Sequence, residues 1–181
     1  MPPWLSQISA AQRKESKLYS SRWLQIATIG IDNTPRVRTV VFRGWSESYE
    51  LEIYTDTRSQ KYHELNLNNN VEICWLFSSS KCQFRLRGTS TKDLSNDRHL
   101  HWNKLSQTAK SMWRWPTPGD NYIIDNNNDL LVKTNEEESK NFSLLKIDIN
   151  YVDQLLLHKP IHFRRKWIRK KNKWIEERIN P

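Results

Sequence analysis

Hydrophobic and polar residues alternate along most of the chain, and the period of the alternation changes several times. Through residues 6–19 apolar side chains recur at helical spacing, which predicts a first helix. From residue 22 onward the period shortens to two, as expected of half-buried strands. Short polar turns separate three such segments, and we predict antiparallel strands at residues 22–30, 36–45 and 50–55.

A second helix is predicted over residues 59–70. Thr57 and Gln60 match the S/T-x-x-E/Q capping pattern, and a run of asparagines ends the segment. Two further strands follow, residues 71–77 and 82–92, which we expect to pair across the turn SSSK.

In that register the two cysteines of the chain do not face each other. Phe77 lies opposite Cys82, and Cys74 lies opposite Arg85. We therefore expect no disulfide, which fits a reducing compartment.

Residues 96–107 predict another helix, and the polar, acidic stretch 120–141 is interpreted as a loop or lid. Strand patterns return at the C-terminus, over residues 142–157, 160–170 and 174–181. About seven short strands with regular turns and two or three outer helices predict a mainly β fold with peripheral helices, built as a small antiparallel barrel.

The composition fits one cytoplasmic domain. A chain of 181 residues buries roughly 70% of the surface that its unfolded form exposes, so it needs no metal or disulfide to fold. The N-terminus has no basic start followed by an apolar run, and no segment approaches the ~20 apolar residues of a membrane span. We expect residues 1–181 to form a single domain in the cytoplasm.

The charge adds a second hypothesis. Lys and Arg exceed Asp and Glu by 29 to 20, and nine tryptophans accompany them, a combination that suits nucleic acid. The excess is concentrated in residues 162–173, which hold no Asp or Glu. Such a segment is equally typical of a solvated face or an anion site, so nucleic-acid binding stays the lesser alternative.

The segments RVRTVVFRG and YTDTRSQK carry the clearest chemistry. Arg38 and Arg43 lie on one predicted strand, although their opposite parity lets them serve one ligand only if the strand twists or bulges between them. Ser59 and Lys61 begin a helix just after a strand, so a hydroxyl, an ammonium and backbone N–H groups can converge on an anion. We predict a phosphate site without a glycine-rich loop.

Other catalytic patterns are missing from the sequence. The histidines have no Cys or carboxylate partners at metal-ligand spacing, and neither common phosphate-loop motif occurs. His162 and Arg164 lie two residues apart on one predicted strand face, and Gln83 begins another strand, where its amide can read the polar edge of a heterocycle.

Taken together, these motifs resemble the pyridoxamine 5'-phosphate oxidase-related family of FMN-binding flavoproteins, in the branch typical of cyanobacteria. The resemblance extends from RVRTVVFRG through YTDTRSQK and CQFRLRG to the terminal WIEERINP. It implies the split-barrel fold and a homodimer with FMN at the subunit interface.

The resemblance also implies roles for individual residues. Gln83 would contact the flavin of the other subunit, as would the region of Trp113, and Arg164 would contact flavin while His162 and Arg164 orient the substrate as candidate catalytic residues. The residues matching the family's cofactor positions are Arg38, Thr39, Val40, Val41, Arg43, Tyr54, Thr55, Ser59, Gln60, Lys61, Gln83 and Arg164.

By this resemblance the protein is expected to act in vitamin B6 metabolism, oxidising pyridoxamine or pyridoxine 5'-phosphate by hydride transfer to FMN, which O₂ then reoxidises. Several positions depart from the family pattern, and one of them is Gln60, which stands in place of an arginine. Pro160 replaces an arginine, Arg43 replaces a lysine, and Leu155 replaces a tryptophan. An FMN-dependent reductase or oxidase of another small molecule, and a non-catalytic flavin-binding protein, therefore remain alternatives.

Overall fold

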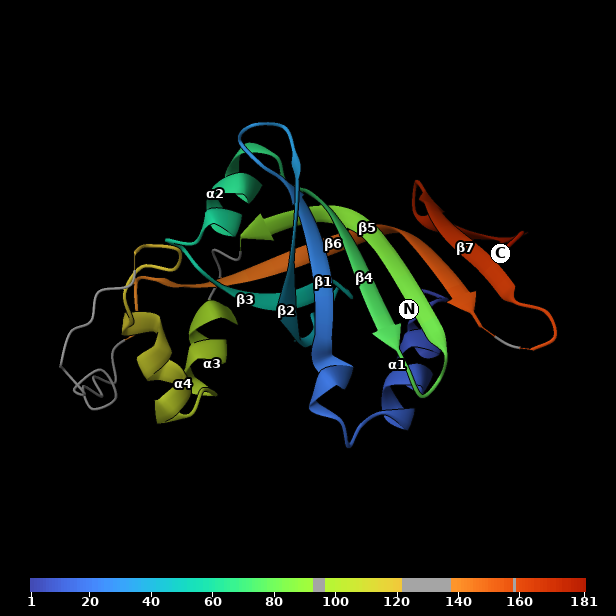
Figure 1. The fold of residues 1–181 in the computed structure, drawn as a ribbon, viewed down its shortest axis with the longest axis horizontal. Coiled ribbons are helices and arrows are strands. Elements are labelled where there is room, and N and C mark those ends of the chain that lie inside the picture. The colour runs from blue at the N-terminus through green and yellow to red at the C-terminus, as the bar shows by residue number, and fades with distance from the viewer. Residues whose placement is uncertain (93–96, 122–137, 158) are drawn as a thin grey trace.

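Eight strands of the described residues form one antiparallel sheet that closes into a barrel (Figure 1). The computed structural model describes residues 1–92, 97–121, 138–157 and 159–181. The strand order is β3-β2-β1-β4-β5-β6-β7-β8, and an additional pairing of β3 with β6 closes the first six strands. The strands are β1 (Trp23–Ile29), β2 (Pro35–Trp45), β3 (Leu51–Asp56), β4 (Asn70–Phe77), β5 (Cys82–Lys92), β6 (Phe142–Leu156), β7 (Phe163–Lys170) and β8 (Lys173–Ile179).

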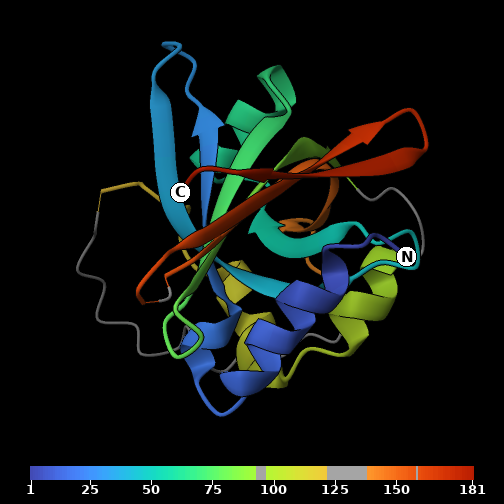
Figure 2. The same cartoon turned by 90° about the vertical axis from the view of Figure 1, so that its right-hand side faces the viewer.

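Short helices lie around the barrel, and β7 and β8 extend from it as a hairpin (Figure 2). Helix α2 lies at one end of the barrel and α1 at the other, while α3 and α4 lie beside β3 (Figure 1). The helices are α1 (Leu5–Lys14), α2 (Gln60–Leu67), α3 (Asp97–Asn103) and α4 (Gln107–Ser111), with 3₁₀ turns η1 (Tyr19–Arg22) and η2 (Met112–Arg114).

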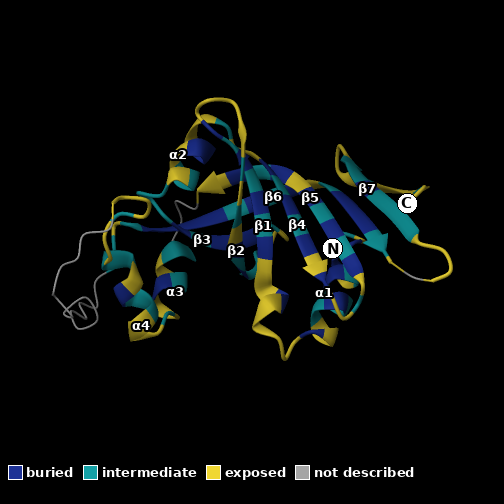
Figure 3. Ribbon diagram, viewed as in Figure 1, coloured by how far each residue is buried: buried dark blue, intermediate teal, exposed yellow. Residues whose placement is uncertain are grey.

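Alternate residues along the strands are buried (Figure 3), and their side chains form the core of the barrel. Trp75 and Phe77 of β4 and Phe84 of β5 are fully buried and contact one another or their neighbours at ring distances of 5.0 to 6.0 Å. Gly88 lies where the β5–β6 register shifts, and a Cβ there would come 2.2 Å from the Asp148 carbonyl oxygen. The missing side chain lets the two strands approach at this point.

The main sequence predictions are confirmed. The predicted barrel is present, each of the predicted strands has its counterpart, and the hairpin of β4 and β5 pairs Phe77 with Cys82 and Cys74 with Arg85. Both cysteines are free thiols.

Several element boundaries were predicted wrongly. The N-cap of α2 is Ser59, whose Oγ accepts from the Tyr62 N–H at 3.4 Å, and the capping box at Thr57 does not form because Arg58 and Asp56 make a tight turn there. The helix predicted over residues 96–107 is two helices, since Ser106 caps a new one, α4. Helix α1 ends at Lys14, and strand β7 begins at Phe163, after the cis bond before Pro160.

Two further predictions concern the lid over residues 120–141 and the absence of a membrane span. Most of the predicted lid over 120–141 lies outside the described residues, as does His158. Among the helices that the structure describes, none is long and apolar enough to span a membrane.

Candidate functional site

A β-bulge near the end of β2 resolves the parity conflict between Arg38 and Arg43. Phe42 pairs with Ile53 and Gly44 with Glu52, so Arg43 is the extra residue between two consecutive pairs. The bulge re-aims the Arg43 side chain relative to the alternating strand before it. Upstream of the bulge, Val40 points into the core, whereas Thr39 and Val41 face outward.

Arg38 lies near the start of β2 and is anchored by a buried acid. Its guanidinium forms an ion pair with Glu64 of α2 at 2.7 Å and a hydrogen bond with Thr28 of β1. Thr28 Oγ1 also donates to Glu64 at 2.5 Å, and Glu64 is only 1% exposed. Arg38 therefore ties α2 to the barrel wall.

Lys61, one turn before Glu64, is a second cation at this end of the site, and it forms no ion pair within the described part of the chain. Burial is the main cause that lowers the pKa of Lys61 to about 8; repulsion from Arg38 also lowers it, and attraction to Asp56 and Glu64 opposes the shift. A desolvated ammonium beside a second cation is stabilised by an incoming anion.

The start of α2 adds neutral groups to this cation. Ser59 caps the helix, its hydroxyl donates to the Asp56 carbonyl at 2.7 Å, and it lies 3.3 Å from the Thr55 hydroxyl. Gln60, the first helical residue, is exposed. The first-turn N–H groups and the positive end of the helix dipole lie at the same point as Lys61.

Arg43 and Tyr54 form the other end of this group. The Arg43 guanidinium carbon lies 4.5 Å from the centroid of the Tyr54 ring, and Arg43 Nε is buried without a hydrogen-bond partner among the described residues. Burial lowers the pKa of Arg43 and raises the pKa of Tyr54. An unsatisfied buried donor on a cation is costly unless a ligand pairs with it.

Gln83 and Arg164 form a second group on the outer face of the sheet. Both pair with Leu155 of β6 in register, Gln83 from β5 and Arg164 from β7, so their side chains share one face. Strands β1 and β4 lie between this group and β2. The structure thus brings the predicted site residues together in two sets, which lie apart within one chain.

The second group contains a buried carboxylate that holds its arginines. Asp153 is 2% exposed and binds Arg164 at 2.8 Å and Arg85 at 2.7 Å. Burial alone raises the pKa of Asp153, but the hydrogen bonds from Arg164 and Arg85 outweigh it and leave the pKa below its ordinary value. Tyr151 also reaches Asp153, at 3.4 Å.

His162 lies just before β7 and lines a surface cavity of about 670 Å³ with Arg164, Arg178 and the C-terminal residues. His162 and Arg164 therefore line the same cavity, although His162 precedes β7 and does not share a strand face with Arg164 as predicted. This cavity is separate from the Arg38–Lys61 end of the first group.

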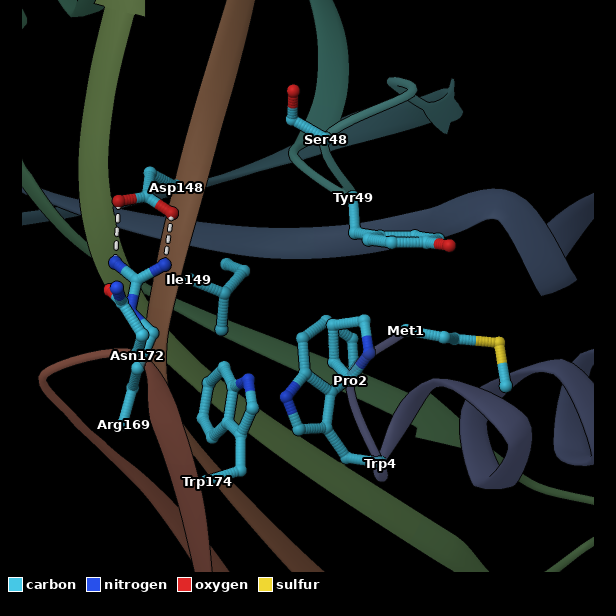
Figure 4. Close-up of a pocket in the computed structure, with 10 residues that line it drawn as sticks. All are labelled: Met1, Pro2, Trp4, Ser48, Tyr49, Asp148, Ile149, Arg169, Asn172 and Trp174. Carbon is cyan, nitrogen blue, oxygen red and sulfur yellow. Dashed lines mark hydrogen bonds and ion pairs between the residues drawn. The ribbon is translucent and has the colours of Figure 1, made fainter.

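Another cavity, of about 290 Å³, lies beside the N-terminus and contains none of the predicted site residues (Figure 4). Trp4 and Trp174 form one side, with ring centroids 5.7 Å apart, and the Asp148–Arg169 ion pair lies on another side. This cavity is distinct from both groups of candidate residues.

The basic segment 162–173 is largely paired with acids. Arg164 binds Asp153, Arg165 binds Glu176, Lys166 binds Glu177 and Arg169 binds Asp148. The run without acids in sequence faces acids from β6 and β8 in space, which reduces the positive field available to nucleic acid.

Three residues of these groups escaped the sequence analysis: Glu64, Asp153 and His101. Each lies far along the chain from the residue it contacts, so no local motif could reveal it. His101 Nδ1 lies 2.8 Å from the Tyr54 hydroxyl, although α3 begins more than forty residues after Tyr54. Among the residues that the structure describes, no cluster of His, Cys, Asp or Glu could hold a metal ion.

Comparison with known proteins gives a consistent family. The model of the pyridoxamine 5'-phosphate oxidase FMN-binding domain matches residues 1–92. Pyridoxine/pyridoxamine 5'-phosphate oxidase 2 of Arabidopsis thaliana is 37% identical over 126 residues, which span 65% of this chain and 64% of that protein.

Solved structures agree with this result. A pyridoxamine 5'-phosphate oxidase-related, FMN-binding protein from Nostoc punctiforme superposes with a TM-score of 0.93 at 33% identity, covering 100% of this chain and 99% of the other. PhzG from Burkholderia lata shares the fold at 16% identity, with a TM-score of 0.86 over 98% of this chain and 91% of its own.

Proposed function

The chain belongs to the pyridoxamine 5'-phosphate oxidase FMN-binding family, and we propose on that premise that it is an oxidoreductase acting on pyridoxamine or pyridoxine 5'-phosphate. FMN is the cofactor of this family domain. Bound FMN supplies the redox chemistry, accepting a hydride equivalent from substrate and passing electrons to O₂. The protein's own residues bind the cofactor and orient the substrate.

The first group of residues fits FMN at both ends. FMN carries a phosphate at one end of its ribityl chain and a ring system at the other, and the five residue steps of β2 from Arg38 to Arg43 span about 16 Å. The unpaired ammonium of Lys61 supports a phosphate at the α2 end, and the orphaned Nε of Arg43 supports an acceptor group at the bulge. The partly buried, desolvated ammonium of Lys61, which forms no ion pair with the described residues, is the main observation behind the proposal.

The cofactor assignment is tested by titrating the purified protein with FMN and following flavin fluorescence and absorbance. We expect saturable quenching with one FMN per chain. A protein that gives no flavin signal at saturating FMN would contradict the proposed site.

The narrower activity is tested by pyridoxal 5'-phosphate formation under air from pyridoxamine 5'-phosphate, with an anaerobic reaction as control. His162 and Arg164 are proposed to orient the substrate, Arg164 being held in place by Asp153. If the FMN-loaded protein is inactive with both B6 phosphates, the flavin reductase or an oxidase of another small molecule becomes the better proposal. The replacements at Pro160, Arg43 and Leu155 are the reason to run this assay first.

We further propose that residues 1–181 act as a homodimer of single domains, with each FMN held by residues of both subunits. The outer face of β1, β2 and β4 exposes large apolar side chains: Trp23 is 51% exposed, Val37 66% and Leu76 49%. Gln83 lies opposite Leu76 in register and so shares this face. A second copy that covers this face would bring its Gln83 and Arg164 toward the first group. Within one chain the two groups lie apart, so a single chain cannot bring them together.

Leu76→Glu tests the dimer, because a charge in the covered face opposes association. Leu100→Glu is the matched control, since Leu100 is 54% exposed on α3, away from this face. We expect L76E to sediment as a monomer and to lose FMN affinity, while L100E behaves as the wild type. A wild-type monomer that binds FMN tightly would exclude the shared site.

Nucleic-acid binding has less support. Four cations of the segment 162–173 are paired, and the remaining Lys170, Lys171 and Lys173 lie at the exposed β7–β8 turn. A gel shift that persists with FMN saturating and weakens steeply with salt would favour this alternative.

A further inference from the structure

A chain of three polar side chains leads from the interior to the Arg43 end of the site. The Tyr54 hydroxyl lies 2.8 Å from His101 Nδ1, and His101 Nε2 lies 3.5 Å from Glu52 Oε2. Glu52 and Tyr54 are two residues apart on β3 and share one face, and His101 reaches them from α3. Glu52 is buried, and His101 is mostly buried.

The ring of Tyr54 is held on other sides as well. Arg43 lies over its face at 4.5 Å, and Phe142 meets it edge-on with a centroid distance of 5.0 Å. The ring therefore has little freedom, and the hydroxyl hydrogen is the part of Tyr54 that can still change direction.

The protonation state of His101 decides that direction. An ionised carboxylate only accepts hydrogen bonds, so Glu52 favours a proton on Nε2. In the neutral ring Nδ1 then accepts, and the Tyr54 hydroxyl donates to His101. In the protonated ring Nδ1 donates to the Tyr54 oxygen, and the hydroxyl hydrogen is released toward a ligand.

We propose that His101 is a positioning residue of the flavin site, which takes up a proton when ligand binds and thereby turns the Tyr54 hydroxyl to donate to an acceptor atom of that ligand. The proton comes from solvent, and no bond other than N–H forms. This inference rests on the proposed flavin site at Tyr54, and it goes further by adding a residue of α3 and a proton to the binding step.

The charges around His101 permit this exchange. Glu52 offsets the new imidazolium charge, and Arg43 and Arg22, which act on Tyr54, oppose it. Lys146 lies opposite Glu52 in the β3–β6 register, and its ammonium binds Asp97 of α3 at 2.5 Å. Among the described residues, Glu52 is therefore the acid in contact with the His101 ring, with Lys146 and Asp97 paired to each other nearby.

The test is calorimetric titration with FMN at neutral pH in buffers of different ionisation enthalpy, which counts the protons taken up on binding. His101→Gln can still accept from Tyr54 and donate to Glu52, but it cannot titrate. The phosphate and Lys61 are common to both proteins, so their proton contributions cancel in the difference. We expect the wild type to take up more protons than H101Q, by up to about one proton per site.

Two further variants complete the experiment. Tyr54→Phe keeps the ring and its contact with Arg43 but removes the hydroxyl, so Y54F is expected to lose the same proton uptake and to carry the test if H101Q does not fold. His99→Gln is the matched control, because His99 is exposed on the same helix and contacts Glu138 and Asn103 instead. H99Q is expected to take up as many protons as the wild type.

The ring nitrogens give a direct readout. In ¹⁵N spectra the His101 signals, assigned by their loss in H101Q, are expected to show one protonated nitrogen in the free protein and two with FMN bound. Equal proton uptake in wild type and H101Q, with both binding FMN, overturns the inference and leaves the proposed function intact. Failure of the wild type to bind FMN overturns the proposed function itself.

Discussion

The two groups of site residues treat positive charge in opposite ways. Around α2 and the β2 bulge, Lys61 and Arg43 are partly or largely buried, and in the described part of the chain neither has an acidic partner. On the outer face, Arg164 and Arg85 share the buried carboxylate of Asp153. The first group leaves Lys61 and Arg43 without an ion pair, although its Arg38 is paired with Glu64, whereas the second group neutralises Arg164 and Arg85.

This difference separates two roles for a cation. An unpaired, desolvated cation is destabilising in the free protein and gains most from an anionic ligand. An arginine fixed by a buried carboxylate contributes less net charge, but its donors are held in one orientation. The first group is thus suited to binding a phosphate, and the second to presenting a positioned guanidinium to a partner or substrate.

The largest effect on ligand binding is expected for Lys61→Met. Loss of a charged hydrogen-bond donor to phosphate costs about 1.5–3 kcal/mol, so FMN affinity is expected to fall roughly 10- to 100-fold. The free protein keeps its stability or gains some, because a desolvated charge is removed. Flavin fluorescence titration and thermal unfolding measure both, with the exposed Lys170→Met as control; unchanged FMN affinity in K61M would remove Lys61 from the site.

Asp153→Asn is expected to lower stability, which Lys61→Met does not. The expected loss is about 2 kcal/mol in the free energy of unfolding. The variant leaves Arg85 and Arg164 without a carboxylate, although both are partly exposed and water offsets some of the cost. Denaturant unfolding measures the loss. Asp32→Asn, in an exposed pair with Arg36, is the control and is expected to lose less stability, because water screens that pair and the asparagine oxygen can still accept from Thr34; equal stability of D153N and D32N would show that the buried carboxylate of Asp153 contributes no more than the exposed one of Asp32.

The pH dependence of FMN affinity and of stability is the smallest expected effect, and its direction follows from the lowered pKa of Lys61. Lys61 has a pKa of about 8 in the folded chain, so its charge is lost as pH rises through 8, and FMN affinity is expected to weaken over the same range. The unfolded chain keeps that proton up to its ordinary value of 10.5, so between pH 8 and 10.5 the Lys61 contribution to free-protein stability rises with pH. Both trends are read as differences between wild type and K61M; parallel pH curves for the two proteins would contradict the lowered pKa.

Much of the fold follows from local patterns. Alternation with a period of two places the strands, and the turn SSSK sets the register that keeps Cys74 and Cys82 apart. These features depend on neighbours in the chain, and they were predictable for that reason. Cap choice was less so, since Thr57 and Ser59 both satisfy the preference for a short hydroxyl side chain, and only the Asp56–Arg58 turn selects Ser59.

The barrel and its strands therefore follow from the local sequence pattern, and the residue types around Arg38 and Lys61 are the basis of the proposed phosphate site. Which charges form an ion pair depends on the tertiary structure. Glu64 neutralises Arg38 and Asp153 neutralises Arg164, while Lys61 and Arg43 stay unpaired and His101 joins Tyr54 from a distant helix. Pairing depends on distances across the sheet, and residues brought together by strand order leave no period or spacing in the chain.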